Sequence, residues 1–138
     1  PRSEVHAAMD ELVTRYDVKL FYGDPYGWET EIEQWGVKYG EDRFQEWPTN
    51  RISRMHPAII RFEVDLAQAR IKHDGCPLAD THFANARKKA RPGQMYTLDK
   101  PTNHQKIDIV MSTILAHEAA ADAHANGWAK KSSRVICF

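Results

Sequence analysis

The sequence has only two cysteines, Cys76 and Cys137, in 138 residues, and no apolar run in it is as long as a membrane-spanning helix. Two cysteines are too few for a disulfide framework or a zinc site, and nothing argues that they pair. The first residues also lack the apolar segment of a secretory signal. These absences predict a protein of the cytoplasm that does not act at a membrane.

A glycine-rich phosphate-binding loop is absent too, which excludes a Walker-type ATPase within this chain. The formal net charge is zero, but residues 1–86 carry 10 Lys and Arg against 15 Asp and Glu, and residues 87–138 carry 9 against 4. An acidic part that holds divalent cations and a basic part that holds phosphate would suit a nuclease. Uneven charge is also common on solvated faces, so the signal is weak.

A buried strand is predicted to end at Asp24. Residues 17–22 are rich in the aromatic and branched side chains that suit a pleated core, and Pro25 removes a backbone donor, so strand pairing should stop there. In open α/β sheets, ligands and metals bind beyond the carboxyl ends of the strands. Alternatively, Asp24 only caps the helix that follows, as an Asp before a helical run often does.

Apolar periodicity predicts an α/β fold in which helices alternate with short strands. The predicted helices span residues 4–16, 28–40, 53–69, 77–91 and 107–126, and the predicted extended segments span 17–22, 44–47, 70–73 and 94–98. A helix that opens a domain in this way normally crosses over from an earlier strand of the same sheet. We therefore expect strands upstream of residue 1.

Asp108 lies in the first turns of the last predicted helix, where the helix dipole favours an acid without any function. Its neighbours Ile107, Ile109 and Val110 are apolar, so this helix end is expected to be partly buried. A carboxylate in such surroundings needs a partner, and a divalent metal shared with Asp24 would provide one. The pattern therefore predicts that Asp24 and Asp108 lie close together.

Asp74 precedes Gly75, an arrangement that commonly forms a turn, and it is also a candidate for a further acid of the same site. A zinc site built from His73, Asp74 and His82 would be short of ligands. The cluster of Arg87, Lys88, Lys89 and Arg91 falls at the end of the predicted helix 77–91. There it either complements the helix dipole or binds phosphate.

Several short motifs in a fixed order carry a resemblance to a known family. They are Phe21-Tyr22-Gly23-Asp24-Pro25 with Trp28, Trp47-Pro48-Thr49-Asn50, Met55, Phe62, His73-Asp74-Gly75 with Pro77-Leu78, His82, Asn85-Ala86, and Lys106-Ile107-Asp108. In order and spacing the series resembles the C-terminal nuclease domain of tailed-phage terminase large subunits. The resemblance covers nearly the whole chain.

The resemblance implies a ribonuclease H-like fold, a mixed sheet flanked by helices, in which three or more acids bind two Mg²⁺ or Mn²⁺ ions and cut concatemeric viral DNA during packaging in the host cytoplasm. Asp24 matches the family's strand-end acid, and Asp108 matches its late acid on the helix. The family's first acid has no counterpart here. Residues 1–127 are thus expected to be the C-terminal portion of the nuclease domain, without its first strands, and residues 128–138 a basic tail.

The partners implied by the resemblance are double-stranded DNA, the terminase small subunit and the portal of the procapsid. The residues expected to contact DNA are Arg87, Lys88, Lys89, Arg91 and Lys106. The missing acid leaves a second interpretation open, a catalytically incomplete fragment or prophage remnant that only binds DNA or protein. A third is an unrelated α/β binding module in which Asp24 and Asp108 only cap helices.

Overall fold

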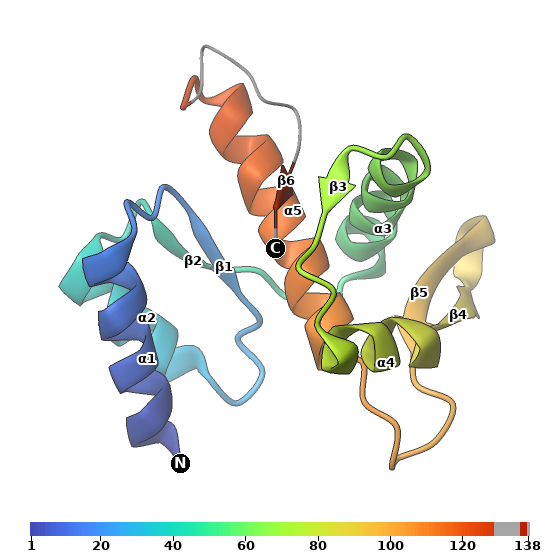
Figure 1. Cartoon of the computed structure of the whole chain (residues 1–138), viewed down its shortest axis with the longest axis horizontal. Helices are drawn as coiled ribbons and strands as arrows, with labels where there is room; N and C mark the ends of the chain where they lie inside the picture. The colour runs from blue at the N-terminus through green and yellow to red at the C-terminus, as the bar shows by residue number, and fades with distance from the viewer. Residues whose placement is uncertain (129–135, 138) are drawn as a thin grey trace. The chain divides into compact units, whose positions relative to one another are not determined.

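The computed structural model describes residues 1–128, 136 and 137. Within them the chain is an α/β protein, as predicted, with five α-helices, one 3-10 turn and six strands (Figure 1). The strands pair into three two-stranded sheets, two parallel and one antiparallel. The chain divides into two compact units, Pro1–Trp47 and Pro48–Phe138, whose relative position is not determined. No helix within the described part is both long and apolar enough to cross a bilayer.

The first unit combines two helices with a parallel pair of short strands. Its elements are α1 (Arg2–Arg15), β1 (Phe21–Gly23), α2 (Glu29–Tyr39) and β2 (Phe44–Glu46). Its core consists of buried apolar side chains from both helices and from β2, namely Met9, Ile32, Trp35 and Phe44. Phe21 of β1 stacks on Phe44, with ring centroids 5.3 Å apart. The aromatic residues that predicted a strand before Asp24 therefore fix that strand to its neighbour.

The second unit is built on two long helices, with α4 and two strand pairs beside them. Its elements are α3 (Ile52–Ala67), β3 (Ile71–Lys72), α4 (Pro77–Asn85), β4 (Arg87–Arg91), the 3-10 turn η1 (Pro92–Gln94), β5 (Met95–Asp99), α5 (Asp108–Ala125) and β6 (Ile136–Cys137). Helix α5 packs against α3 and α4, and β5 packs against α3. Met55 and Ile59 of α3 and Ile114 of α5 are fully buried side chains of this unit.

Polar side chains also link α3 to α5, and the two on α5, His117 and Glu118, are buried. Arg61 donates two hydrogen bonds to the carboxylate of Glu118, at 2.7 and 2.5 Å, and the Glu118 side chain is only 5% exposed. Asp65 contacts His117 Nε2 at 2.7 Å and accepts a bond from Arg70 at 3.2 Å. Burial raises the pKa of Asp65, but the hydrogen bonds from His117 and Arg70 outweigh it and hold that pKa below its usual value. Charged hydrogen bonds therefore join α3 to α5 in addition to their apolar contacts.

The predicted basic tail, residues 128–138, falls mostly outside the described residues, which end at 128 and resume at 136 and 137. The described pair forms β6, which runs parallel to β3, with Ile136 opposite Ile71.

Candidate functional site

Asp24 directly follows β1, at the carboxyl end of two parallel strands. The pairing runs in register from Phe21 opposite Phe44 to Gly23 opposite Glu46, and the Trp47 amide then donates to the Gly23 carbonyl at 2.7 Å. A Cβ on Gly23 would lie 2.9 Å from the Ile32 side chain, so the missing side chain lets α2 pack against the strand end. The predicted strand end is confirmed, and a rigid pair of strands supports the carboxylate.

The helix-cap interpretation of Asp24 is wrong. Helix α2 begins at Glu29, its N-cap is Trp28, and no side chain caps it. Instead, Asp24 Oδ1 accepts a hydrogen bond from the Tyr26 amide at 3.3 Å, within a turn that continues through Gly27 at φ +73°. The turn orients a half-buried carboxylate that has no part in starting the helix.

Asp108 is the first residue of α5, as predicted, but its side chain is exposed. The side chain of Asp108 is exposed because Val110, two positions later, packs into the core. Positions two apart on a helix of about 3.6 residues per turn lie on nearly opposite sides. Val110 faces the core at 2% exposure, and Asp108 therefore faces solvent. The helix end is partly buried as expected, with Ile107 and Ile109 half-buried, but the Asp108 carboxylate itself is exposed. No described side chain forms an ion pair or hydrogen bond with it, so its oxygens are available to a cation.

Helix α4 holds the chain on both sides of Asp108. On the N-terminal side, Asn85 Nδ2 donates to the Lys106 carbonyl at 2.9 Å, and Gln105 Nε2 donates to Asn85 Oδ1 at 3.3 Å. On the C-terminal side, the Ile109 amide donates to His82 Nδ1 at 3.1 Å. The motif series in the sequence includes His82 and Asn85, but nothing in it predicted that either side chain contacts the chain around Asp108. The sequence signal that could have revealed this role is the spacing of His82 and Asn85, two polar residues three positions apart on one face of α4.

Asp24 belongs to the first unit and Asp108 to the second, so their predicted closeness stays a prediction. Within the described residues, no three His, Cys, Asp or Glu side chains gather closely enough to hold a metal ion. Two carboxylates are too few to hold two divalent ions, because the ions repel each other and each needs several oxygen ligands. A site that uses this pair therefore requires at least one further acid.

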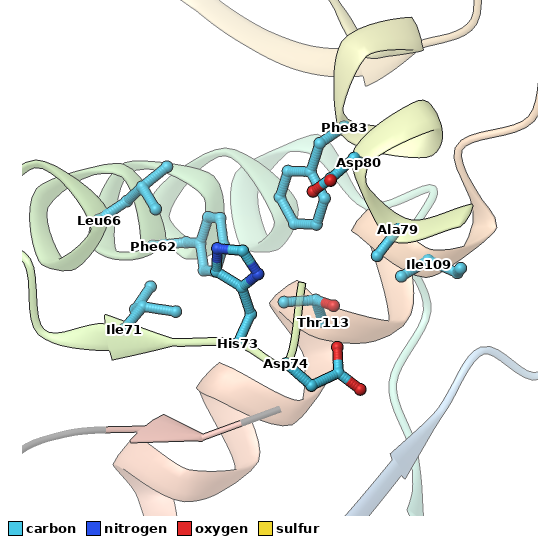
Figure 2. Close-up of a pocket in the computed structure, with 10 residues that line it drawn as sticks. All are labelled: Phe62, Leu66, Ile71, His73, Asp74, Ala79, Asp80, Phe83, Ile109 and Thr113. Atoms are coloured by element: carbon cyan, nitrogen blue, oxygen red, sulfur yellow. The ribbon is translucent and has the colours of Figure 1, made fainter. Parts of the chain in front are cut away.

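Asp74 forms a turn ahead of α4. Its Oδ1 accepts the Cys76 amide at 3.0 Å, and Gly75 has a φ of +74°. It also borders a pocket of about 250 Å³ in the second unit (Figure 2). The pocket is lined by Phe62, Leu66, Ile71, His73, Asp74, Ala79, Asp80, Phe83, Ile109 and Thr113. The Asp74 and Asp80 carboxylates stand well apart on either side of it, so the pocket is mainly apolar rather than an acidic site.

The basic cluster is a strand, not the end of a helix. Helix α4 ends at Asn85, and residues 87–91 form β4, which pairs antiparallel with β5 across the turn at Pro92, Gly93 and Gln94. Gly93 and Gln94 both have positive φ values, 77° and 59°, which closes a tight hairpin. The run Arg-Lys-Lys-Ala-Arg favours a helix by intrinsic propensity, but the turn and the pairing with β5 override that preference.

Strand alternation divides the cluster into two faces. Lys88 lies on the face turned to α3, 4.5 Å from the centre of the Tyr96 ring and 3.5 Å from Glu63, whose carboxylate raises the pKa of this lysine. Arg87, Lys89 and Arg91 occupy the other face. The helix-capping interpretation holds for Arg87, which donates to the Ala84 and Ala86 carbonyls at the end of α4.

Among the described residues, Lys89 lies 3.4 Å from Asp99 and Arg91 donates to Thr97 at 2.9 Å, both within the hairpin. Lys106 is exposed, and its carbonyl is bound by Asn85, two residues before Arg87. We call Arg87, Lys89, Arg91 and Lys106 the basic surface. Lys88 does not belong to it.

Two phage proteins are similar to this chain in sequence. The Gene 13 protein of Mycobacterium phage D29 is 28% identical over 133 residues, and the Gene 13 protein of Mycobacterium phage L5 is 27% identical over 133 residues. Each alignment covers 88% of this chain and 22% of the phage protein, so the chain spans about a fifth of the length of these curated relatives. No family model and no solved structure matches the chain.

Proposed function

We propose that this chain is the C-terminal part of a ribonuclease H-like nuclease domain from the large subunit of a phage DNA-packaging terminase, which cuts concatemeric viral DNA with two divalent metal ions. The observation that carries the proposal is the Asp24 carboxylate at the carboxyl end of two parallel strands, where metal and ligand sites of α/β sheets lie. The phage origin of both similar proteins supports it. Their greater length leaves room for an upstream acid and for an ATPase motor.

Asp24 and Asp108 are the proposed metal ligands, with Asp74 as a further candidate. The residues fit this role because Asp24 is oriented by the Tyr26 amide and the exposed Asp108 carboxylate has no partner among the described side chains. When bound, Mg²⁺ or Mn²⁺ would activate the attacking water and stabilise the leaving 3′ oxygen of the phosphodiester. The chain's own part is to fix the carboxylates and to hold the DNA backbone.

The basic surface is the proposed DNA contact. Phosphate contacts by Lys and Arg position a duplex without reading its sequence. In this proposal Arg87, Lys89 and Arg91 bind the backbone of double-stranded DNA. Lys88 instead contacts Glu63 of α3 and the Tyr96 ring on the opposite face of the hairpin. The terminase small subunit and the portal of the procapsid are the proposed protein partners.

The salt dependence of DNA binding tests the basic surface. Changing Arg87, Lys89 and Arg91 together to Gln is expected to weaken binding and to flatten the slope of log affinity against log salt by about 0.9 for each phosphate that the variant no longer neutralises. The matched control is Lys88→Gln, which removes one positive charge from the same strand on the face turned to α3. Fluorescence anisotropy with a labelled duplex over a series of NaCl concentrations measures both slopes. If Lys88→Gln changed the salt slope as much per removed charge as the triple variant does, Arg87, Lys89 and Arg91 would not be the specific DNA contact.

A second candidate function is DNA or protein binding without cleavage, by a catalytically incomplete fragment or prophage remnant. The observation that favours it is the lack of three metal-binding side chains gathered in the described part of the chain. Plasmid cleavage separates the two functions. The decisive comparison uses an extended protein, which joins this chain to the sequence encoded immediately upstream of it.

A further inference from the structure

Two side chains of α4 hold the segment that carries Asp108. His82 and Asn85 are three positions apart, so they lie on the same face of α4, the face turned to the start of α5. Asn85 binds the chain at Gln105 and Lys106, and His82 binds it at Ile109. The proposed metal ligand lies between these anchored positions.

His82 supplies a hydrogen-bond acceptor for a backbone amide at the start of α5. The first amides of a helix have no partner within it, and a side chain at the N-cap commonly provides one. The N-cap of α5 is Ile107, which forms no side-chain cap. His82 Nδ1 accepts the Ile109 amide instead, from a side chain that is 8% exposed. To accept there, the imidazole must carry its proton on Nε2.

The contacts of Asn85 fix the loop before the helix. Its amide group donates to the Lys106 carbonyl and accepts from Gln105, so it uses both its donor and its acceptor on consecutive residues. A buried imidazole and a half-buried amide therefore hold the backbone on either side of an exposed carboxylate. Such an arrangement restrains the backbone beneath a side chain that forms no hydrogen bond or ion pair with any described residue.

We propose that His82 and Asn85 are positioning residues that orient Asp108 for metal binding. The inference rests on the proposed nuclease function and on Asp108 as a metal ligand. Residues that support metal ligands in this way typically change metal affinity or activity by about 10–100-fold when they are replaced. Their loss should therefore weaken metal activation while leaving the basic surface, and hence DNA affinity, intact.

The test uses the extended protein and compares His82→Leu with His82→Asn. Leu fills the buried space without an acceptor, whereas the Asn side-chain oxygen stands close to where Nδ1 stood. We expect His82→Leu to raise the Mn²⁺ concentration for half-maximal plasmid cleavage by about 10-fold or more, with KM for DNA changed less than about twofold. His82→Asn should recover most of that loss, and excess Mn²⁺ should restore the rate of His82→Leu. Thr81→Ala, at an exposed neighbour on α4, is the matched control.

Asn85→Leu provides a second variant, at a half-buried position, if His82→Leu fails to fold. An unchanged Mn²⁺ dependence in a folded His82→Leu or Asn85→Leu variant, or a His82→Asn variant no better than His82→Leu, would overturn the positioning role. Asp108→Asn is assayed alongside. If that variant is inactive while the His82 and Asn85 variants cleave normally, only the positioning role fails. If Asp108→Asn cleaves normally, the proposed function itself fails at this residue.

Discussion

In the extended protein, Asp24→Asn and Asp108→Asn are each expected to reduce Mn²⁺-dependent plasmid cleavage by at least about 100-fold, since losing a ligand costs more than losing a residue that only supports one. The physical reason is charge. Two divalent ions about 4 Å apart repel each other strongly, and carboxylate oxygens must offset that repulsion to hold both ions in place. An amide keeps the shape of the side chain and removes its charge.

The loss should lie in metal occupancy and positioning rather than in DNA affinity. Supercoiled plasmid nicking with Mn²⁺ measures it, with Asp80→Asn as the control, because this carboxylate is exposed on α4 and is not a proposed ligand. On the proposed function, the present chain alone should cleave little or not at all, because Asp24 and Asp108 are too few acids to hold two divalent ions, and Asp74 would account for a weak residual rate. Robust cutting by the chain alone would show that fewer acids suffice. Cutting by the Asp24 or Asp108 variants at the unsubstituted rate would remove those residues from the active site.

The second large effect concerns stability. Arg61→Met is expected to destabilise the second unit, because it leaves the buried Glu118 carboxylate without its partner, a change that costs about 3–5 kcal/mol when the pair is fully buried. The Arg61 side chain is 52% exposed, so water partly replaces it and the expected cost falls to about 2 kcal/mol. Urea unfolding followed by far-UV circular dichroism measures the change.

The double variant Arg61→Met with Glu118→Leu is the control for this prediction. Replacing both charges by apolar groups of similar size is often nearly neutral, so the double variant should unfold within about 1 kcal/mol of the unsubstituted protein. Lys72→Met, at an exposed position on β3, reports the effect of removing a surface charge alone. A double variant as unstable as Arg61→Met would show that the pair itself, rather than the unpaired carboxylate, determines the cost.

Local sequence signals were sufficient for much of the fold. Gly23 and Pro25 bracket the end of β1, Asn126 follows the end of α5, and each boundary lies close to its predicted position. The hairpin was the main error. Residues 87–91 have good helix propensity, and only their pairing with Met95–Asp99, a tertiary contact, makes them a strand.

In the candidate site too, features set by local sequence could be predicted, and features set by tertiary contacts could not. The position of Asp24 at a strand end could be predicted from its own neighbours, because an aromatic run followed by Gly-Asp-Pro is a local pattern. The exposure of Asp108 depends on which face of α5 packs inward, and the contacts of His82 and Asn85 join residues more than 20 positions apart. Such contacts have no signature in the residues adjacent to them.

The central claim is that Asp24 and Asp108 share one metal centre, and a crystal structure of the extended protein with Mn²⁺, located by anomalous scattering, tests it most directly. The account predicts two ions about 4 Å apart, each with a carboxylate oxygen from this pair or from the upstream acid, and carboxylates of Asp24 and Asp108 about 4–8 Å from each other. Carboxylates of Asp24 and Asp108 too far apart to share or bridge metal ions, or Mn²⁺ held by other residues, would contradict it.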